Sequence, residues 1–512
     1  MLFNSIEFLF LFLPASLLGF FVLQNFGART AIMAWLVVCS LMFYGWWNPI
    51  YLPLLALSAI FNFLVGKRLA REDKLRGKYW LWFGVLFNLG LLVYFKYANF
   101  FVAAITTLSP ANFNFQSIIL PLAISFYTFQ QITYLVDANR GKIQPHTFLE
   151  YCLFVSFFPQ LIAGPIVHHS QMLEQFKRLT DRSKRYENLV VGASVLVIGL
   201  FKKVVLADTF AKFATPIFAL SGTGYELSAL DAVTGSLSYA FQLYFDFSGY
   251  SDMAIGLACM FGLRLPVNFF SPYRAQNISD FWRMWHATLS RFLRDYVYSG
   301  MGGFMCSPRR ARFNLFATMF LGGVWHGAGW TFLVYGLCHG FYVVAHQVWR
   351  VRVSGPLGLV GRPSYKALAQ LFTFLVVVLT LVVFRAETLA EAANIYSSLL
   401  KWEYLAFSPS YLAALQSIDS LALISQLLGD VELGSLISAA LLMALLLCWL
   451  FPSTYQLFRS LDIMIEKPLA GREPVVKICW TPSAYWAVFM GVLLVAALMN
   501  LTQVSEFLYF QF

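Results

Sequence analysis

Apolar runs of membrane-spanning length follow one another along almost the whole chain. A helix of about 20 apolar residues crosses a membrane, and the two longest runs are long enough to count as one or two crossings each. The runs are continuous and do not alternate with polar positions, which favours helices over the strands of a barrel. The sequence therefore predicts an all-α polytopic membrane protein with roughly 11 to 14 transmembrane or re-entrant helices. The runs lie near residues 7–25, 30–48, 50–65, 79–97, 116–136, 149–167, 188–206, 228–262, 314–348, 367–384, 433–451 and 482–501.

Two segments are too polar to span a membrane but have one apolar face. Over residues 277–298, "NISDFWRMWHATLSRFLRDYVY", helical spacing places Trp282, Trp285 and His286 on one side and the charged side chains on the other. This pattern predicts a continuous amphipathic helix that lies in, or dips into, the membrane interface. A weaker pattern of the same kind runs over 386–402, where a threonine is expected to cap a helix before Glu391. Helices that avoid spanning indicate a protein shaped around a cavity.

Composition agrees with a membrane protein. Only 12% of the 512 residues are charged, against about 25% in an average soluble chain. The net charge of +11 comes from basic residues in short loops such as 66–78 and 309–312, as expected for loops on the cytoplasmic side, so nucleic-acid binding is not expected. The seven cysteines have neither disulfide nor zinc spacing, so no metal site is predicted.

The sequence predicts a single integral-membrane domain over residues 1–512. No polar domain separates the apolar runs, and no repeat with a period of about 20 to 50 residues is visible. The first run has no Lys or Arg before Arg29. We therefore expect a retained first helix, with an atypical signal peptide as the alternative.

The most informative stretch is "LGGVWHGAGWTFLVYGLCHG" at 321–340, which places His326 and His339 in a long run without any Asp, Glu, Lys or Arg. Ionisable side chains at membrane depth usually face protein or a water-filled cavity. The glycines around His326 allow close helix approach or local unwinding. A neutral imidazole can accept and return a proton near neutral pH. His326 is therefore the first catalytic candidate and His286 the second, while a buried structural histidine is the alternative for each.

Other polar groups in apolar surroundings have weaker functional interpretations. His339 and His346 share one face of a regular helix, turned away from His326, which favours a structural role for both. Cys338 and His339 are adjacent, which is poor geometry for a hydrogen-bonded catalytic dyad.

The stretch "QLYFDFSGYSDMAIG" at 242–256 places Asp246 and Asp252 among apolar residues. A buried structural pair satisfied by Ser248, Ser251 or nearby tyrosines is favoured. A polar lining of a substrate path, with Asp246 as a supporting residue, is the alternative.

These motifs resemble those of the membrane-bound O-acyltransferases, in particular the bacterial branch typified by the alginate O-acetyltransferase membrane subunit. The resemblance rests on residues 277–350 and covers most of residues 1–350, but it is weak after 400. The matching stretches are "FWRMWHATLSRFLRDYVY" with "LGGVWHGAGWTFLVYGLCHG", "FKYANF" at 95–100, "LPLAISFYTFQQITYLVDANRG" at 120–141, "FFPQLIAGPI" at 157–166, "FKKVVLADTFA" at 201–211 and "LYFDFSGYSDMAIG" at 243–256.

The resemblance implies a bowl-shaped bundle with a central tunnel and a histidine at its waist. It makes 277–350 the catalytic motif region, His326 the general base towards the attacking hydroxyl, and His286 a group that orients the acyl carbonyl or assists proton transfer. Acetyl-CoA is the expected donor substrate, with no bound cofactor, and the acetyl group crosses the bacterial inner membrane. The implied acceptor is an exported polysaccharide such as alginate, reached directly or through a periplasmic acetyltransferase.

The last residues, "SEFLYFQF" at 505–512, resemble the aromatic tail of the small partner peptide in lipoteichoic acid D-alanylation, whose tyrosine is proposed to carry the acyl group. The matching residue is Tyr509, within an aromatic tail at 502–512. Eight extended residues reach roughly 26 Å, enough to return towards the middle of the bilayer. The alternative is an interfacial anchor of aromatic side chains.

Two further functions stay open. The D-alanyl and peptidoglycan O-acyl transferases share the same motifs, so the acceptor is not determined by them. A polysaccharide or lipid translocator without catalysis belongs to a different class, and it predicts helix breaks at matching positions of two halves, which the sequence lacks.

Overall fold

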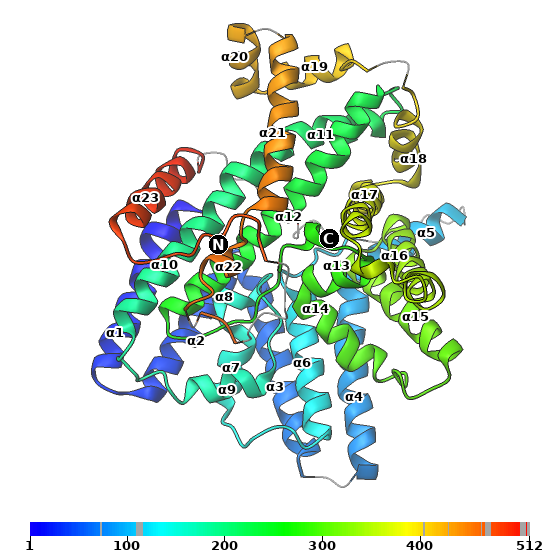
Figure 1. The fold of residues 1–512 in the computed structure, drawn as a ribbon. Helices are drawn as coiled ribbons and strands as arrows, with labels where there is room; N and C mark the ends of the chain where they lie inside the picture. The colour runs from blue at the N-terminus through cyan, green and yellow to red at the C-terminus, as the bar shows by residue number, and fades with distance from the viewer. Residues whose placement is uncertain are drawn as a thin grey trace.

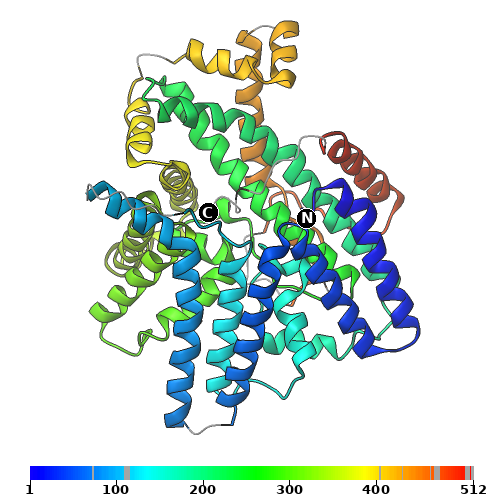
Figure 2. The same ribbon diagram turned by 180° about the vertical axis from the view of Figure 1, so that it is seen from behind.

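The computed structural model describes residues 1–71, 74–108, 116–402, 405–428, 430–461, 463–465, 473–501 and Leu508. These residues form helices, and the β-contact found among them is one isolated parallel bridge between Leu265 and Met464. The predicted all-α fold is confirmed. Figures 1 and 2 show the helices from two opposite sides.

The helices, with η for 3-10 and π segments, have the following bounds: η1 Phe8–Phe12, α1 Leu13–Asn25, α2 Arg29–Gly45, η2 Pro49–Tyr51, α3 Leu52–Leu69, α4 Lys74–Leu92, η3 Val93–Tyr97, α5 Ala98–Leu108, α6 Ile124–Asn139, α7 Phe148–Ser156, α8 Phe158–Leu161, α9 His169–Phe176, α10 Arg185–Phe201, η4 Lys202–Ala207, α11 Asp208–Gly222, α12 Ala229–Met260, η5 Pro272–Arg274, α13 Ile278–Met284, α14 Ala287–Phe292, η6 Leu293–Tyr298, α15 Pro308–His326, α16 Trp330–Trp349, η7 Arg350–Ser354, η8 Leu359–Gly361, α17 Pro363–Arg385, α18 Leu389–Ser398, α19 Pro409–Gln416, α20 Asp419–Leu428, α21 Asp430–Leu450, α22 Thr454–Leu457 and α23 Ala484–Met499.

Among the described residues, six helical stretches are long and apolar enough to cross a membrane, and two apolar helices, α2 and α23, are shorter. This number is below the 11 to 14 crossings or part-crossings that the apolar runs predict. The difference has a physical cause: runs such as 149–167 fold into short helices, α7 and α8, that are buried in protein. The six stretches are Phe8–Asn25, Pro49–Leu69, Arg76–Thr106, Arg185–Gly222, Pro363–Arg385 and Leu433–Leu450.

The centre of the molecule is built on α12, which packs along α10 (Figure 1). A side-chain carbon added to Gly199 would lie 2.6 Å from the carbonyl oxygen of Gly249, and one added to Gly192 would lie 2.6 Å from that of Gly256. Larger residues at these positions would push the two backbones apart. Small residues of this kind let helices approach closely where lipid provides no hydrophobic drive.

The apolar run 314–348 forms two helices, α15 and α16, that pack against each other. α15 ends at His326, and extended backbone at Gly327 and Gly329 separates it from Trp330. The helices touch at Gly323, where an added side-chain carbon would lie 2.4 Å from the Cα of Gly336. The regular helix assumed for comparing His326 with His339 is therefore wrong, because the chain turns directly after His326.

The prediction of one continuous amphipathic helix over 277–298 is also wrong. The segment forms α13, α14 and the π-helix η6, with a break at Trp285 and His286. Its aromatic face is buried in protein: Trp282 and Trp285 are 8% and 5% exposed. The break has a tertiary cause, because the backbone on either side of it bonds to an earlier segment: Phe270 N donates to Met284 O, and Ala287 N to Asn268 O, both at 2.9 Å.

The second polar segment behaves as its pattern predicts. Within 386–402, α18 starts directly after Thr388, whose hydroxyl accepts a hydrogen bond from the backbone N–H of Glu391 at 3.1 Å. The predicted helix cap is confirmed.

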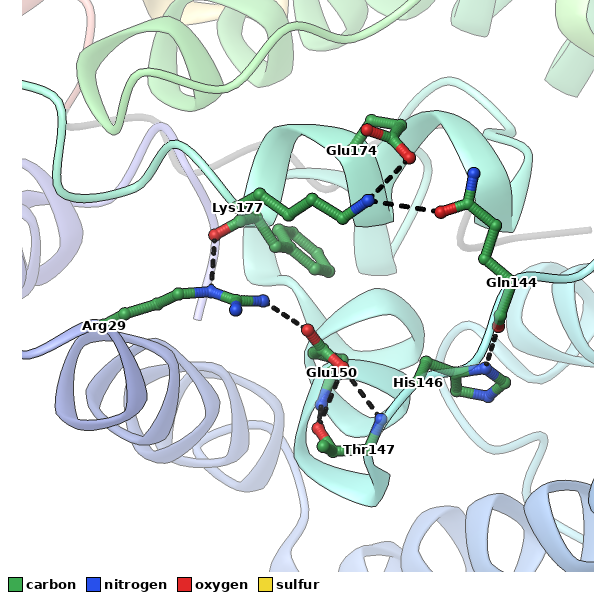
Figure 3. A network of polar contacts seen from close by, with 8 residues as sticks. Arg29, Gln144, His146, Thr147, Glu150, Glu174 and Lys177 are labelled. Atoms are coloured by element: carbon green, nitrogen blue, oxygen red, sulfur yellow. Dashed lines mark hydrogen bonds and ion pairs between the residues drawn. The ribbon is translucent and has the colours of Figure 1, made fainter.

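A polar network joins the start of α2 to α7 and α9, outside the spanning helices (Figure 3). Arg29 pairs with the Glu150 carboxylate, which also accepts the backbone N–H of Thr147 at 2.8 Å. Lys177 pairs with Glu174 at 2.8 Å and donates to Gln144. Burial acts to raise the pKa of Glu150, but the hydrogen bonds from Thr147 and the charge and hydrogen bond of Arg29 outweigh it, so that pKa lies below its usual range.

We expect Glu150→Gln to make the free energy of unfolding less dependent on pH in the acidic range. A lowered pKa contributes stability above the unfolded-state value, about 4.3, and this stability is lost as the pH falls towards the folded-state pKa. Near neutral pH, the free energy of unfolding of Glu150→Gln should therefore be lower than that of wild type by about 0.5–1 kcal/mol, as for a partly exposed pair. This difference should shrink as the pH falls. Thermal unfolding in detergent across this pH range measures it. Glu174→Gln, at an exposed pair, should change less, and a difference that stays constant with pH would contradict the assignment.

Candidate active site

His326 is the last residue of α15 and is 7% exposed. Its ring lies against three aromatic rings, with centroids 5.1 Å from Trp325, 5.9 Å from Tyr335 on α16 and 5.3 Å from Phe384 on α17. The Nδ1 atom is buried without a hydrogen-bond partner. An imidazole nitrogen without a hydrogen-bond partner can accept a proton from a hydroxyl, which is the property that the predicted general base needs.

His286 occupies the break between α13 and α14 and is 1% exposed. Its φ of 42° is left-handed, a conformation that costs free energy in a residue with a side chain and is often found at functional sites. Nδ1 lies 3.3 Å from Asn268 Oδ1, and Nε2 is buried without a partner. The ring is nearly perpendicular to that of Phe247 of α12, at a centroid distance of 4.8 Å.

Trp325 connects the two histidines. Its indole ring lies 6.4 Å from the His286 ring and 5.1 Å from the His326 ring. Both imidazoles therefore belong to one buried aromatic cluster although 40 positions separate them in the sequence. Neither ring faces bulk solvent. Their catalytic roles stay predictions.

Asn268 holds the strained turn at His286, and sequence reasoning missed it. Its Oδ1 accepts hydrogen bonds from the Thr288 hydroxyl at 2.6 Å and from the Thr288 backbone N–H at 3.4 Å. The Thr288 hydroxyl in turn accepts the backbone N–H of Ile166 at 3.0 Å. The sequence feature that could have pointed to Asn268 is a polar residue in a largely apolar stretch, but such a residue alone does not indicate its partners.

Lys96 is the second residue that sequence reasoning missed. It lies in the π-helix η3, is 8% exposed, and its Nζ donates to the carbonyl oxygens of Trp325 at 2.6 Å and of His326 at 3.0 Å. The neighbouring Tyr97 hydroxyl donates to the Val324 carbonyl. The last carbonyls of a helix have no partner within it and carry its negative end, so an ammonium group there stabilises the terminus. Lys96 therefore fixes the end of α15 at the residue that carries the candidate imidazole.

The remaining histidines of this region have partners. His339 is buried on α16, where its Nδ1 accepts a hydrogen bond from Trp282 Nε1 at 3.1 Å. His346 Nδ1 lies 2.9 Å from the Ser279 hydroxyl. Both contacts tie α16 to α13, and they agree with the structural role that the sequence favours.

The expected partners of the two aspartates of α12 are wrong. Asp246 pairs with Lys203 at 2.7 Å and Asp252 pairs with Lys202 at 2.6 Å. Both lysines lie in η4, in the motif "FKKVVLADTFA". Serines and tyrosines are therefore not what holds these carboxylates, although the Thr454 hydroxyl also donates to Asp252, at 2.6 Å.

Tyr509 lies outside the described residues. The preceding residue, Leu508, is described: it is 6% exposed, and its backbone N–H donates to Asp246 Oδ2 at 3.2 Å. The C-terminal segment therefore contacts the interior of the protein at this point.

Comparison with known proteins identifies the family. Residues 81–379 match the membrane-bound O-acyltransferase family. The chain is 43% identical over 427 residues to the peptidoglycan O-acetyltransferase of Helicobacter pylori, covering 78% of this chain and 80% of that one. It is 39% identical over 429 residues to the probable alginate O-acetylase of Pseudomonas aeruginosa, covering 81% and 78%. The teichoic acid D-alanyltransferase of Streptococcus thermophilus is more distant, at 29% identity over 46% of this chain and 58% of the other.

The family match covers more than half of the chain and includes His286, His326 and Lys96. The six long apolar helical stretches among the described residues independently indicate a multi-pass membrane protein. The chain therefore belongs to the membrane-bound O-acyltransferase family and is an O-acyltransferase.

Proposed function

We propose that this protein transfers acetyl groups from a cytoplasmic thioester, acetyl-CoA, across the bacterial inner membrane for O-acetylation of an exported polysaccharide. Two similar proteins, at 43% and 39% identity, are named for O-acetylation of peptidoglycan and alginate. The observation that carries the proposal is His326, a buried imidazole with an unpaired nitrogen at the break of a helical hairpin whose residues 314–349 include no Asp, Glu, Lys or Arg.

The distribution of charge supports a cytoplasmic donor. The sequence at the lower ends of α3 and α4 in Figure 1, residues 66–78, contains six Lys and Arg and two Asp and Glu. Segment 386–402, which lies near the upper ends of α11 and α12 in Figure 1, contains two acidic residues, Glu387 and Glu391, and one basic residue, Lys401. The positive-inside rule places the basic side in the cytoplasm, where an acyl thioester with an anionic carrier would approach it.

The chemistry needs one proton to move. A hydroxyl oxygen attacks the thioester carbonyl carbon as the His326 imidazole takes the hydroxyl proton. The carbon–sulfur bond breaks, the new ester forms, and the imidazolium returns its proton to the departing sulfur. The Nδ1–H of His286 donates to Asn268 Oδ1, so its unpaired Nε2 is an acceptor, which suits His286 to assist this proton transfer. The surrounding aromatic rings exclude water, which limits hydrolysis of the thioester.

The C-terminal segment supplies the first acceptor in this proposal. The Tyr509 hydroxyl attacks the thioester, and an acetyl-tyrosine ester results. A periplasmic acetyltransferase then removes the acetyl group with its own hydroxyl and passes it to the polysaccharide. A phenol has a pKa of about 10, so it needs a base to attack at neutral pH, and it is a better leaving group than an alcohol.

The direct test is the ester-linked acetate of the exported polysaccharide in a strain lacking this gene and in the same strain with the gene restored. The proposal predicts loss and recovery of the esters. Unchanged acetate in the deletion strain, with the polymer still exported, would contradict it. Loss of the polymer itself would instead indicate a translocator.

Lys96→Met is expected to reduce acetyl transfer about 10- to 100-fold, because misplacement of a reacting group by about 1 Å can cost this much. Methionine keeps the length of the side chain and removes the ammonium group that holds the Trp325 and His326 carbonyls. The measurement is turnover of purified protein at saturating acetyl-CoA, with yield and melting temperature recorded in parallel.

Two variants separate positioning from folding. Lys96→Arg keeps a donor to the carbonyls and should recover part of the turnover. Tyr97→Phe removes the neighbouring bond to Val324, one residue further from the imidazole, and should lose less. Equal losses in Lys96→Met and Tyr97→Phe, parallel to their melting temperatures, would mean that Lys96 only stabilises the fold.

A further inference from the structure

Asp246 is a buried carboxylate with one unusual partner. It is 2% exposed in the middle of α12, and its Oδ1 pairs with Lys203 Nζ at 2.7 Å. Lys203, also 2% exposed, holds Asp208 at 3.0 Å as well. The other oxygen of Asp246 accepts the backbone N–H of Leu508, 262 positions away in the sequence. Buried ionic groups are costly unless their hydrogen-bonding capacity is satisfied, so the C-terminal segment completes this site.

The same helix provides a comparison. Asp252 also pairs with a lysine of η4, and its further contact is the Thr454 hydroxyl. Both of these partners of Asp252 are side chains, and neither belongs to the C-terminal segment. Asp246 differs because one of its partners is a main-chain amide of the C-terminal segment, and a hydrogen bond from an amide to a carboxylate is stronger than one between neutral groups.

The position of Asp246 connects the C-terminal segment to the candidate active site. The next residue of α12, Phe247, contacts the His286 ring at 4.8 Å. Tyr509 is the residue that follows Leu508 in the sequence.

We propose that Asp246, oriented by Lys203, is a positioning residue that docks the C-terminal segment in the interior through the Leu508 amide. Docking is a property of the folded chain. Its consequence, presentation of Tyr509 for acylation, rests on the proposed function.

The test is digestion of the purified, full-length protein in detergent with a carboxypeptidase, followed by mass spectrometry of the released residues 509–512. Leu508→Pro removes the amide N–H and leaves Asp246 and its ion pair in place. We expect it to raise the release rate about tenfold or more, as the loss of a hydrogen bond to a charged group predicts. Leu508→Ala loses the same buried side chain but keeps the N–H, so it is the matched control, and Leu508→Pro should release these residues about tenfold faster than Leu508→Ala.

A second pair of variants examines the receptor side. Asp246→Asn should release the segment faster, whereas Asp252→Asn, the matched carboxylate on the same helix, should not. If Asp246→Asn fails to fold, the proline and alanine pair still decides the question. Equal release from Leu508→Pro and Leu508→Ala would overturn the docking proposal. Faster release from Leu508→Pro, with normal acetylation by Tyr509→Phe, would keep the docking and reject the acyl-carrier role.

Discussion

His326→Ala is expected to lower polysaccharide acetylation to the background of a strain lacking the gene, while purified yield and melting temperature stay close to wild type. Removal of a general base typically costs about 10²- to 10⁴-fold in rate. The cost to the fold should be modest because Nδ1 makes no hydrogen bond that the substitution would break. The measurement is ester-linked acetate in the exported polymer, with membrane yield as the control.

Two further variants separate chemistry from packing at this position. His326→Gln fills more of the space among Trp325, Tyr335 and Phe384 but cannot act as a base, so it should be as inactive as His326→Ala. His346→Ala, on the same hairpin but bonded to Ser279 outside the aromatic cluster, should keep most of its activity. Normal acetate in His326→Ala would refute the catalytic assignment, and collapsed yield in both His326 variants would favour a structural role.

Tyr509→Phe is expected to abolish acetylation with an effect as large as that of His326→Ala. The substitution keeps the ring and removes only the hydroxyl, so an anchoring role of the aromatic tail would survive it. The Leu508 amide is unchanged, so docking at Asp246 should also survive. Acetate in the exported polymer measures the effect, and Tyr485→Phe, at a residue that is 89% exposed, is the control. Acetylation at the wild-type rate would show that the tail is an anchor.

The sequence predicts most strongly what depends on local pattern. The continuous apolar runs indicate an all-α membrane protein, the Thr388 cap starts α18 as predicted, and the glycines around His326 mark a real break between two closely packed helices. Each of these features is decided by residues within a few positions of one another.

What the sequence could not predict depends on distant partners. The helical spacing of 277–298 is intact, but the chain breaks at His286 because Asn268 binds the backbone and hydroxyl of Thr288. In the sequence, Lys96 is a single charged residue in an apolar run, and only the folded structure shows that it binds the carbonyls at the end of α15. The two aspartates of α12 pair with lysines of η4, and no local sequence pattern identifies such pairs.

The most direct test of the central claim is incubation of the purified protein with radiolabelled acetyl-CoA, followed by mass spectrometry of its C-terminal peptide. The account predicts release of the free thiol and an acetyl group on Tyr509 in the wild type. It predicts neither product in His326→Ala. Labelling of Tyr509 in His326→Ala at the wild-type rate, or no consumption of the thioester by the wild type, would contradict it.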